Sequence, residues 1–235
     1  MSRDLVYGRR PVHEALRGPR EVLELWASER AVKSEGWLRE LERPRVQTKL
    51  ERELSEAAGT RDHQGAVAWC EPYRYADAFE LAGPAPLLAC LDQVSDPRNL
   101  GAVIRSAEGA GADGVVIPAH GSARVTAAVS RASAGAVEHV PVAVVPNLAR
   151  YLAEIKSGDL WVAGAVGESG TPMWQADLSG GIAFVFGAEG KGLRPLVRRT
   201  CDLEVSIPQL GRVESLNVSV AAAVLLYEAR RQRDG

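Results

Sequence analysis

Five apolar runs without polar alternation recur through the second half of the chain, with helix-like segments between them. The runs cover residues 87–91, 114–117, 140–145, 160–165 and 182–186, and the helical patterns cover 99–110, 123–132, 147–156, 191–199 and 215–232. Such runs are typical of parallel strands that helices bury on both faces. The sequence therefore predicts an α/β fold with a parallel sheet over residues 87–235.

The first 71 residues have a different residue pattern, with 13 basic and 13 acidic side chains and only short apolar runs. Their pattern predicts a small α/β module with strands at 22–26 and 66–70 and helices at 10–16, 34–43 and 49–58. Proline and glycine are frequent in residues 72–86, which predicts a linker.

Composition restricts the class of protein but does not identify its binding partner. With 46% hydrophobic and 25% charged residues the chain is typical of a globular protein, and no apolar run reaches the roughly 18 residues of a membrane span. The start has no signal-peptide core, and the three cysteines show neither metal-ligand nor disulfide spacing, so we expect a cytoplasmic protein without a metal. The net charge of −2 means that any RNA contact must come from local arginine clusters.

A first candidate for chemistry is the loop after the run at 87–91, together with the helix that follows it. Leu100, Val103 and Ile104 form an apolar stripe, so Arg105 is predicted on the opposite face, one turn after Gly101. The alternative is that Arg105 pairs with Glu108 on a solvated surface and that Asn99 only caps the helix.

A second candidate is the glycine-rich turn at 187–192, which contains Glu189. Exposed backbone N–H groups in such turns allow a ligand to approach closely. The glycine order matches neither a P-loop nor a dinucleotide fingerprint, and a purely structural tight turn is the alternative.

A third candidate is the loop at 206–219, where Ser215 and Asn217 precede the last helix. Either residue could be an N-cap and nothing more. Because ligands bind beyond the carboxyl ends of parallel strands, we expect the three loops to form one site.

In this order, the three segments resemble the three motifs of the SpoU (TrmH-like) branch of the SPOUT RNA methyltransferases. The matching residues are 99–105, 187–193 and 215–221. Residues 6–16 and 63–67 resemble the small L30e-like domain that binds the RNA substrate in this family. The resemblance implies an RNA-binding domain at 1–71, a linker at 72–86 and a methyltransferase domain at 87–235.

The resemblance also implies features that the residue pattern does not predict. The sheet would contain a deep trefoil knot that holds S-adenosylmethionine against Gly187, Ile207 and Leu216. The family acts as a homodimer with its site across the interface, where Val220, Val224 and Tyr227 of the last helix would lie. Gln209 departs from the methionine that many relatives have after the proline.

The implied reaction moves a methyl group from S-adenosylmethionine to a ribose 2′-hydroxyl of RNA, which excludes DNA as a substrate. Arg105 would act on the hydroxyl, either as the base or as a positive clamp on the developing alkoxide. Because arginine is normally never deprotonated, we prefer the clamp. Asn99, Glu189, Ser215 and Asn217 would orient Arg105 and the ribose.

Within the family the resemblance favours a guanosine of 23S ribosomal RNA, either as naked RNA or in an assembling ribosomal particle. Transfer RNA and the adenosine target of the thiostrepton-resistance methyltransferases are alternatives. A non-catalytic RNA-binding module and a nucleotide-binding switch are the alternatives from other classes. The predicted RNA contacts are Arg9, Arg10, Arg17 and Arg20 in front, with Arg124 nearer the catalytic residues.

Overall fold

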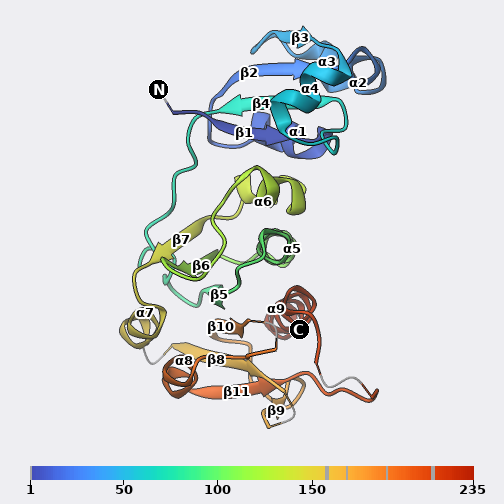
Figure 1. Ribbon diagram of the computed structural model, residues 1–235. Coiled ribbons are helices and arrows are strands. Elements are labelled where there is room, and N and C mark those ends of the chain that lie inside the picture. The colour runs from blue at the N-terminus through green and yellow to red at the C-terminus, as the bar shows by residue number, and fades with distance from the viewer. Residues whose placement is uncertain (1, 157–158, 168, 189, 213–214) are drawn as a thin grey trace. The chain divides into compact units, whose positions relative to one another are not determined.

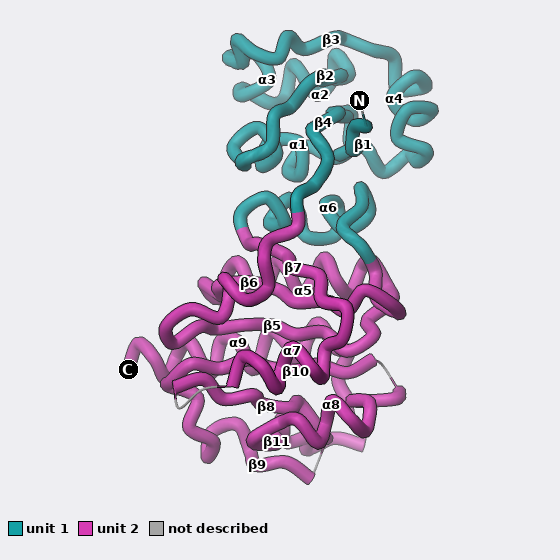
Figure 2. Tube along the Cα trace, turned by 90° about the vertical axis from the view of Figure 1, so that its left-hand side faces the viewer, with its two compact units in different colours: residues 1–74, 124–139 teal, residues 75–123, 140–235 magenta. Residues whose placement is uncertain are grey.

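The computed structural model describes residues 2–156, 159–167, 169–188, 190–212 and 215–235, and the chain divides into two compact units. Unit 1 comprises residues 1–74 and 124–139, and unit 2 comprises residues 75–123 and 140–235 (Figure 2). Residues 124–139, which the sequence pattern places with the parallel sheet, therefore fold with the first unit.

Unit 1 is built on a four-stranded sheet in the order β1-β4-β2-β3, in which β4 is antiparallel to both of its neighbours. The strands are β1 (Asp4–Tyr7), β2 (Val22–Ala27), β3 (Val46–Thr48) and β4 (Ala66–Cys70). The helices are α1 (Arg9–Arg17), α2 (Glu29–Ser34), α3 (Gly36–Glu40), α4 (Glu51–Ala58), α6 (Ala127–Ala132) and the 3-10 turn η1 (Ala136–Glu138). The helix expected at 34–43 is wrong, because the chain breaks at Glu35 and forms two short helices instead.

Unit 2 is built on a seven-stranded sheet in the order β7-β6-β5-β10-β8-β11-β9, with every pair parallel. Its strands are β5 (Leu87–Asp92), β6 (Gly114–Pro118), β7 (Val142–Val145), β8 (Leu160–Val166), β9 (Thr171–Pro172), β10 (Gly181–Gly187) and β11 (Leu203–Ser206). The α/β fold and the five predicted strands are thus confirmed.

Four helices cover this sheet on its two faces. They are α5 (Pro97–Gly109), α7 (Leu148–Ile155), α8 (Pro195–Thr200) and α9 (Val218–Asp234). Helices α5 and α9 pack together on one face, and α7 and α8 lie on the other (Figure 1). The central strands β5 and β10 are buried almost throughout, which explains why their residues are apolar without alternation.

The segment before β5 packs against unit 2. Ala76 forms a parallel bridge with Ala143 of β7, and the buried Tyr151 of α7 donates its hydroxyl to the Ala78 carbonyl at 2.7 Å. This segment, which the sequence predicted to be a linker, therefore packs against β7 and α7. Across the described ranges, no helix combines the length and apolarity needed to cross a lipid bilayer.

Candidate functional site

A cavity of about 770 Å³ lies in unit 2, where several strands of the sheet end. Its walls come from the ends of β8 and β10, the turn after β10, β11 with the loop behind it, and the start of α9. The structure brings five of the predicted site residues to this one cavity: Gly187, Ile207, Ser215, Leu216 and Asn217. The second and third loops therefore lie together at one cavity, as the sequence led us to expect.

Gly187 ends β10 at a place where a side chain does not fit. A Cβ atom on this residue would lie 2.1 Å from the Gly192 carbonyl carbon and 2.5 Å from the Leu193 nitrogen. The chain turns back at once, since the Gly192 amide donates to the Ala188 carbonyl at 2.9 Å. Absence of a side chain at Gly187 thus lets the turn fold over the strand end and form a wall of the cavity. Glu189, also predicted in this site, lies outside the described residues.

A buried carboxylate joins the first and second predicted loops. Asp92 ends β5 beside Gly187 in the sheet register, and its side chain is fully buried. It accepts from the backbone N–H of Arg194 at 2.8 Å and from the Arg194 Nε at 2.7 Å. Asp92 therefore holds the end of the glycine-rich turn against the neighbouring strand. The sequence shows an aspartate directly after a buried run, but no local pattern indicates its partner about a hundred residues away.

Two asparagines link the first and third loops. The Asn217 Nδ2 donates to the Asn99 Oδ1 at 3.1 Å. Asn217 is also the N-cap of α9, because its Oδ1 accepts from the Ser219 backbone N–H at 2.9 Å. Asn99 does not cap its helix, since α5 begins at Pro97 and its N-cap is Asp96. The side-chain amide of Asn99 is thus not used as a helix cap, and it is available for contacts where the first and third loops meet.

A second cavity of about 330 Å³ adjoins the first. Ala188, Lys191 and Val218 line both, while Asn99 lines only the smaller one. Gln93, the first residue after β5, also lines it and adopts a left-handed backbone with φ 63°. Such strained backbone in a non-glycine residue is frequent at functional loops.

Arg105 lies apart from both cavities. It is exposed on α5, six residues or about 9 Å of helix beyond Asn99. In the part of the chain that the structure describes, its side chain makes no hydrogen bond or ion pair, including the possible pair with Glu108. A single copy of the chain therefore does not bring Arg105 to Gly187 and Leu216.

The predicted RNA contacts all belong to unit 1. Arg9 and Arg10 line a third cavity, and Arg17 is exposed and pairs with Glu14 at 3.5 Å. Arg20 is buried instead, with only 7% of its side chain exposed, and its guanidinium pairs with Glu138. Arg124, expected beside the catalytic residues, is part of the segment that folds with unit 1.

A protein metal site requires several ligating side chains around one point. Within the described ranges, no three His, Cys, Asp or Glu side chains gather as a metal site would require.

A parallel α/β sheet with a cavity at the strand ends, walled by a glycine-rich turn and the start of the last helix, defines a class of α/β enzymes that bind a nucleotide-like cofactor there. The comparisons with known proteins give the family. Residues 86–227 match the family described as SpoU rRNA Methylase, and residues 5–76 match the family described as RNA 2′-O ribose methyltransferase substrate binding. The chain belongs to the SpoU rRNA methylase family, and it is a methyltransferase.

Three relatives illustrate the extent of the similarity. The chain is 40% identical to the 23S rRNA (guanosine-2′-O-)-methyltransferase RlmB of Shewanella oneidensis, over 99% of this chain and 98% of that protein. The SpoU methyltransferase AviRb of Streptomyces viridochromogenes, solved with AdoMet, is 27% identical with a TM-score of 0.82, over 98% of this chain and 90% of that one. A structure described for 2-OH methylation of C/U34 on tRNA is 29% identical with a TM-score of 0.57 and matches 64% of this chain and 97% of its own.

Proposed function

We propose that this protein transfers a methyl group from S-adenosylmethionine to a ribose 2′-hydroxyl of RNA, at a guanosine of 23S ribosomal RNA. The observation that carries the proposal is the pair of adjoining cavities, which have Gly187, Ile207 and Leu216 on one side and Asn99 on the other. One cavity would hold the methyl donor and the other the ribose that receives the methyl group.

The larger cavity fits the cofactor in size and chemistry. Its volume of about 770 Å³ lies in the range usual for cofactor pockets, roughly 300–1,000 Å³. Phe186, Leu193 and Leu225 supply apolar surface for an adenine ring, and the turn after Gly187 brings backbone groups to the same wall. S-adenosylmethionine supplies an activated methyl group, so the protein has only to orient the reactants and manage one proton.

The chain's own residues would position the hydroxyl at the junction of the cavities. The Asn217–Asn99 hydrogen bond lies there, with Lys191 in the lining of both cavities. In the reaction the hydroxyl oxygen bonds to the methyl carbon, the carbon–sulfur bond breaks, and the hydroxyl proton leaves to the RNA phosphate or to a side chain. A cationic donor near this oxygen would stabilise the developing negative charge.

We assign that cation to Arg105 of the partner subunit in a homodimer. Arg105 is exposed and lies outside the cavities of its own chain, while α5 packs beside α9. Helix α9 presents an apolar stripe of Val220, Val224 and Tyr227, of which Val220 is 46% and Tyr227 52% exposed. Apolar side chains at this spacing on one helix suit a symmetric interface. The interface would bring each Arg105 to the other chain's site.

Ribosomal RNA is favoured over transfer RNA by the share of this chain that the relatives of each kind match. A relative that matches 99% of this chain is named a 23S rRNA guanosine methyltransferase, whereas a tRNA-directed structure matches only 64% of it. We therefore propose a cytoplasmic enzyme that acts on 23S RNA or on an assembling ribosomal particle, with unit 1 as the RNA-binding part. The trefoil knot is proposed with it, on the ground of the family to which the chain belongs.

The decisive experiment maps 2′-O-methyl groups in ribosomal and transfer RNA from strains with and without the protein. The proposal expects one guanosine of 23S RNA to lose its methyl group and to regain it on complementation. A loss in transfer RNA, or at an adenosine of 23S RNA, would support the corresponding alternative. Unchanged methylation in all RNA, together with no transfer of tritiated methyl in vitro, would refute the proposal.

A further inference from the structure

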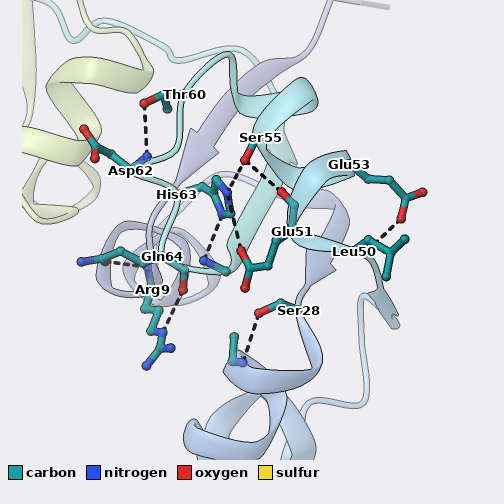
Figure 3. Close-up of polar contacts among 12 residues, drawn as sticks. Arg9, Ser28, Leu50, Glu51, Glu53, Ser55, Thr60, Asp62, His63 and Gln64 are labelled. Atoms are coloured by element: carbon teal, nitrogen blue, oxygen red, sulfur yellow. Dashed lines mark hydrogen bonds and ion pairs between the residues drawn. The ribbon is translucent and has the colours of Figure 1, made fainter.

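Unit 1 brings a serine, a histidine and a glutamate together, which are the residue types of a hydrolytic triad (Figure 3). The His63 Nδ1 accepts from the Gly65 backbone N–H at 3.0 Å, so its Nε2 carries the proton and donates to the Ser55 Oγ at 2.9 Å. The Ser55 hydroxyl donates in turn to the Glu51 carbonyl at 2.9 Å. His63 therefore has no ring nitrogen free to accept a proton from the serine, and the cluster fastens a turn to α4 instead of providing a nucleophile.

A lysine and an arginine line the two adjoining cavities of unit 2. They are the only basic residues in the described lining, and of the two only Lys191 lines both cavities. Arg198 is neutralised, because its Nη2 donates to the Glu204 carboxylate at 2.6 Å and to the Ser169 hydroxyl at 3.2 Å. The hydrogen bond to Glu204 raises the pKa of Arg198 above its usual value. The charge of Arg198 is therefore committed to the protein.

The charge of Lys191 is available to a ligand. Lys191 is exposed, and within the described residues its ammonium group has no hydrogen bond or ion pair. The only carboxylate in the described lining of the smaller cavity is that of Asp96, which caps α5 by accepting from the Arg98 backbone N–H at 2.8 Å. Gly190 and Gly192 flank Lys191 with φ 72° and 63°, a left-handed backbone that glycine adopts without strain. The turn thus places a cation where the two cavities adjoin.

The backbone of the same turn is not available to an anion. The N–H groups of Lys191 and Gly192 both donate to the Ala188 carbonyl, at 3.3 Å and 2.9 Å. A glycine-rich turn holds a phosphate with its backbone only through N–H groups that are unpaired. An anion at this place would therefore be bound by the Lys191 side chain, whose flexible stem and compact charge suit a phosphate.

The charge of the cofactor indicates which anion this is. S-adenosylmethionine has a positive sulfonium and a positive ammonium group but only one carboxylate, so a lysine in the cavity wall opposes its binding as a whole. RNA carries a negative charge at every phosphate. In the target nucleotide, the 2′-oxygen and the 3′-phosphate are attached to neighbouring carbons of one ribose. A hydroxyl beside the Asn99–Asn217 hydrogen bond would therefore bring its own phosphate within reach of Lys191.

We propose that the Lys191 ammonium group binds the phosphate on the 3′ side of the methylated ribose and so holds the 2′-hydroxyl in position for the transfer. The inference rests on the proposed function, which puts this ribose at the junction of the cavities. It gives the site a second cation besides Arg105 of the partner subunit. The partner's Arg105 acts on the charge that develops at the reacting oxygen, and Lys191 acts on the permanent charge of the neighbouring phosphate.

The test measures transfer of tritiated methyl to a synthetic 23S RNA fragment that contains the guanosine found by the mapping experiment. K191Q should lower kcat/KM for the fragment roughly 10- to 100-fold, which is usual for the loss of one hydrogen bond between charged groups, and K191R should recover most of it. Because Lys191 is exposed, both variants should keep the wild-type melting temperature. The matched control is R199Q, which removes the same charge from an exposed residue of α8 outside both cavities and should leave kcat/KM unchanged.

A neutral methylphosphonate in place of the 3′-phosphate makes the test specific to that contact. For the wild type, this change in the RNA should lower kcat/KM as far as K191Q does. For K191Q it should cause no further loss, because both changes remove the same interaction. A methylphosphonate farther along the fragment is the control, and it should affect the wild type and K191Q by the same factor.

Equal kcat/KM for K191Q, R199Q and the wild type would overturn the proposal, and so would losses from K191Q and the 3′-methylphosphonate that multiply. Calorimetry with S-adenosylmethionine tests the other anion. The proposal expects K191Q to bind the cofactor at least as tightly as the wild type, whereas weaker binding would place Lys191 on the methionine carboxylate and overturn the proposal. Absence of methyl transfer by the wild type to the unmodified fragment would refute the proposed function itself, so the two failures are distinguishable.

Discussion

Arg20 and Glu138 form a buried ion pair although 118 positions separate them in the chain. The Arg20 Nε donates to the Glu138 Oε2 at 2.9 Å, and the two side chains are 7% and 0% exposed. Burial by itself lowers the pKa of Arg20, but the hydrogen bond and the charge of Glu138 outweigh it and raise the pKa above the usual value. The pair fastens the segment 124–139 to unit 1, so the two family matches do not coincide with the two structural units.

Removal of one partner should therefore destabilise the protein strongly. Glu138→Ala leaves a buried guanidinium without its counter-charge, and we expect a loss of about 3–5 kcal/mol in the free energy of unfolding measured with urea. Arg17→Gln is the control, because it breaks an exposed pair with Glu14 and should cost less than about 1 kcal/mol. Equal losses for the two variants would contradict a structural role for the buried pair.

The two functions of Asn217 can be separated by a conservative change. Asn217→Asp keeps an oxygen to cap α9 but loses the amide that donates to Asn99, so folding should survive while methyl transfer falls. Asn217→Ala loses the cap as well and should cost about 1 kcal/mol of stability. The measurement is turnover with tritiated cofactor beside a melting curve for each variant. Full activity in Asn217→Asp would remove the Asn99 contact from the mechanism.

Gly187→Ala should weaken cofactor binding by roughly one to two orders of magnitude. The new Cβ atom would overlap the Gly192 backbone, so the turn that walls the cavity must move, at a cost of about 1–3 kcal/mol. Gly180→Ala is the control, since a Cβ atom there meets nothing within 4 Å. Calorimetric titration with S-adenosylmethionine checks both variants, and an unchanged affinity in Gly187→Ala would show that the turn is not part of the cofactor site.

Arg105→Ala should fold and bind cofactor but lose methyl transfer by orders of magnitude. The proposed dimer allows a sharper test, in which Arg105→Ala is mixed with a cofactor-deficient variant such as Gly187→Ala after dissociation of the subunits. Half of the dimers would then contain one intact site, which restores about a quarter of the wild-type activity. If Arg105 acted in its own chain, the mixture would stay inactive.

The thiol of Cys201 should make stability depend on pH in the alkaline range. Burial raises its pKa to about 11, so the folded protein favours the protonated thiol. Its contribution to stability is fully present below the unfolded pKa of about 8.5 and is lost as the pH rises towards 11, by up to about 1.4 kcal/mol per pH unit. Urea unfolding between pH 8 and pH 11 should therefore show a steeper decline for the wild type than for Cys201→Ala. Parallel declines would mean that the thiol does not ionise in this range.

Five strands of unit 2 were predictable because a parallel strand covered on both faces consists of an uninterrupted apolar run. The run at 182–186, for example, lies within β10. The second and third loops were predictable as one site for a related reason, since parallel strands bring their carboxyl ends to one edge of the sheet. Short edge strands contain no such apolar run. The edge strands β1, β3 and β9, of four, three and two residues, were missed because they form only by pairing with a longer neighbour.

By itself, the sequence determined the α/β class and the alternation of strands and helices along the chain. It also determined which loops meet at the cavity. Each of these depends on residues that are close together in the chain. Only the tertiary structure decided that residues 124–139 fold with unit 1, that Asp92 holds Arg194 and that Arg20 is buried, because each depends on a partner roughly a hundred residues away. The same holds for Arg105. Helical periodicity placed it on the exposed face of α5, but its separation from the cavity of its own chain depends on how α5 packs against the sheet and α9.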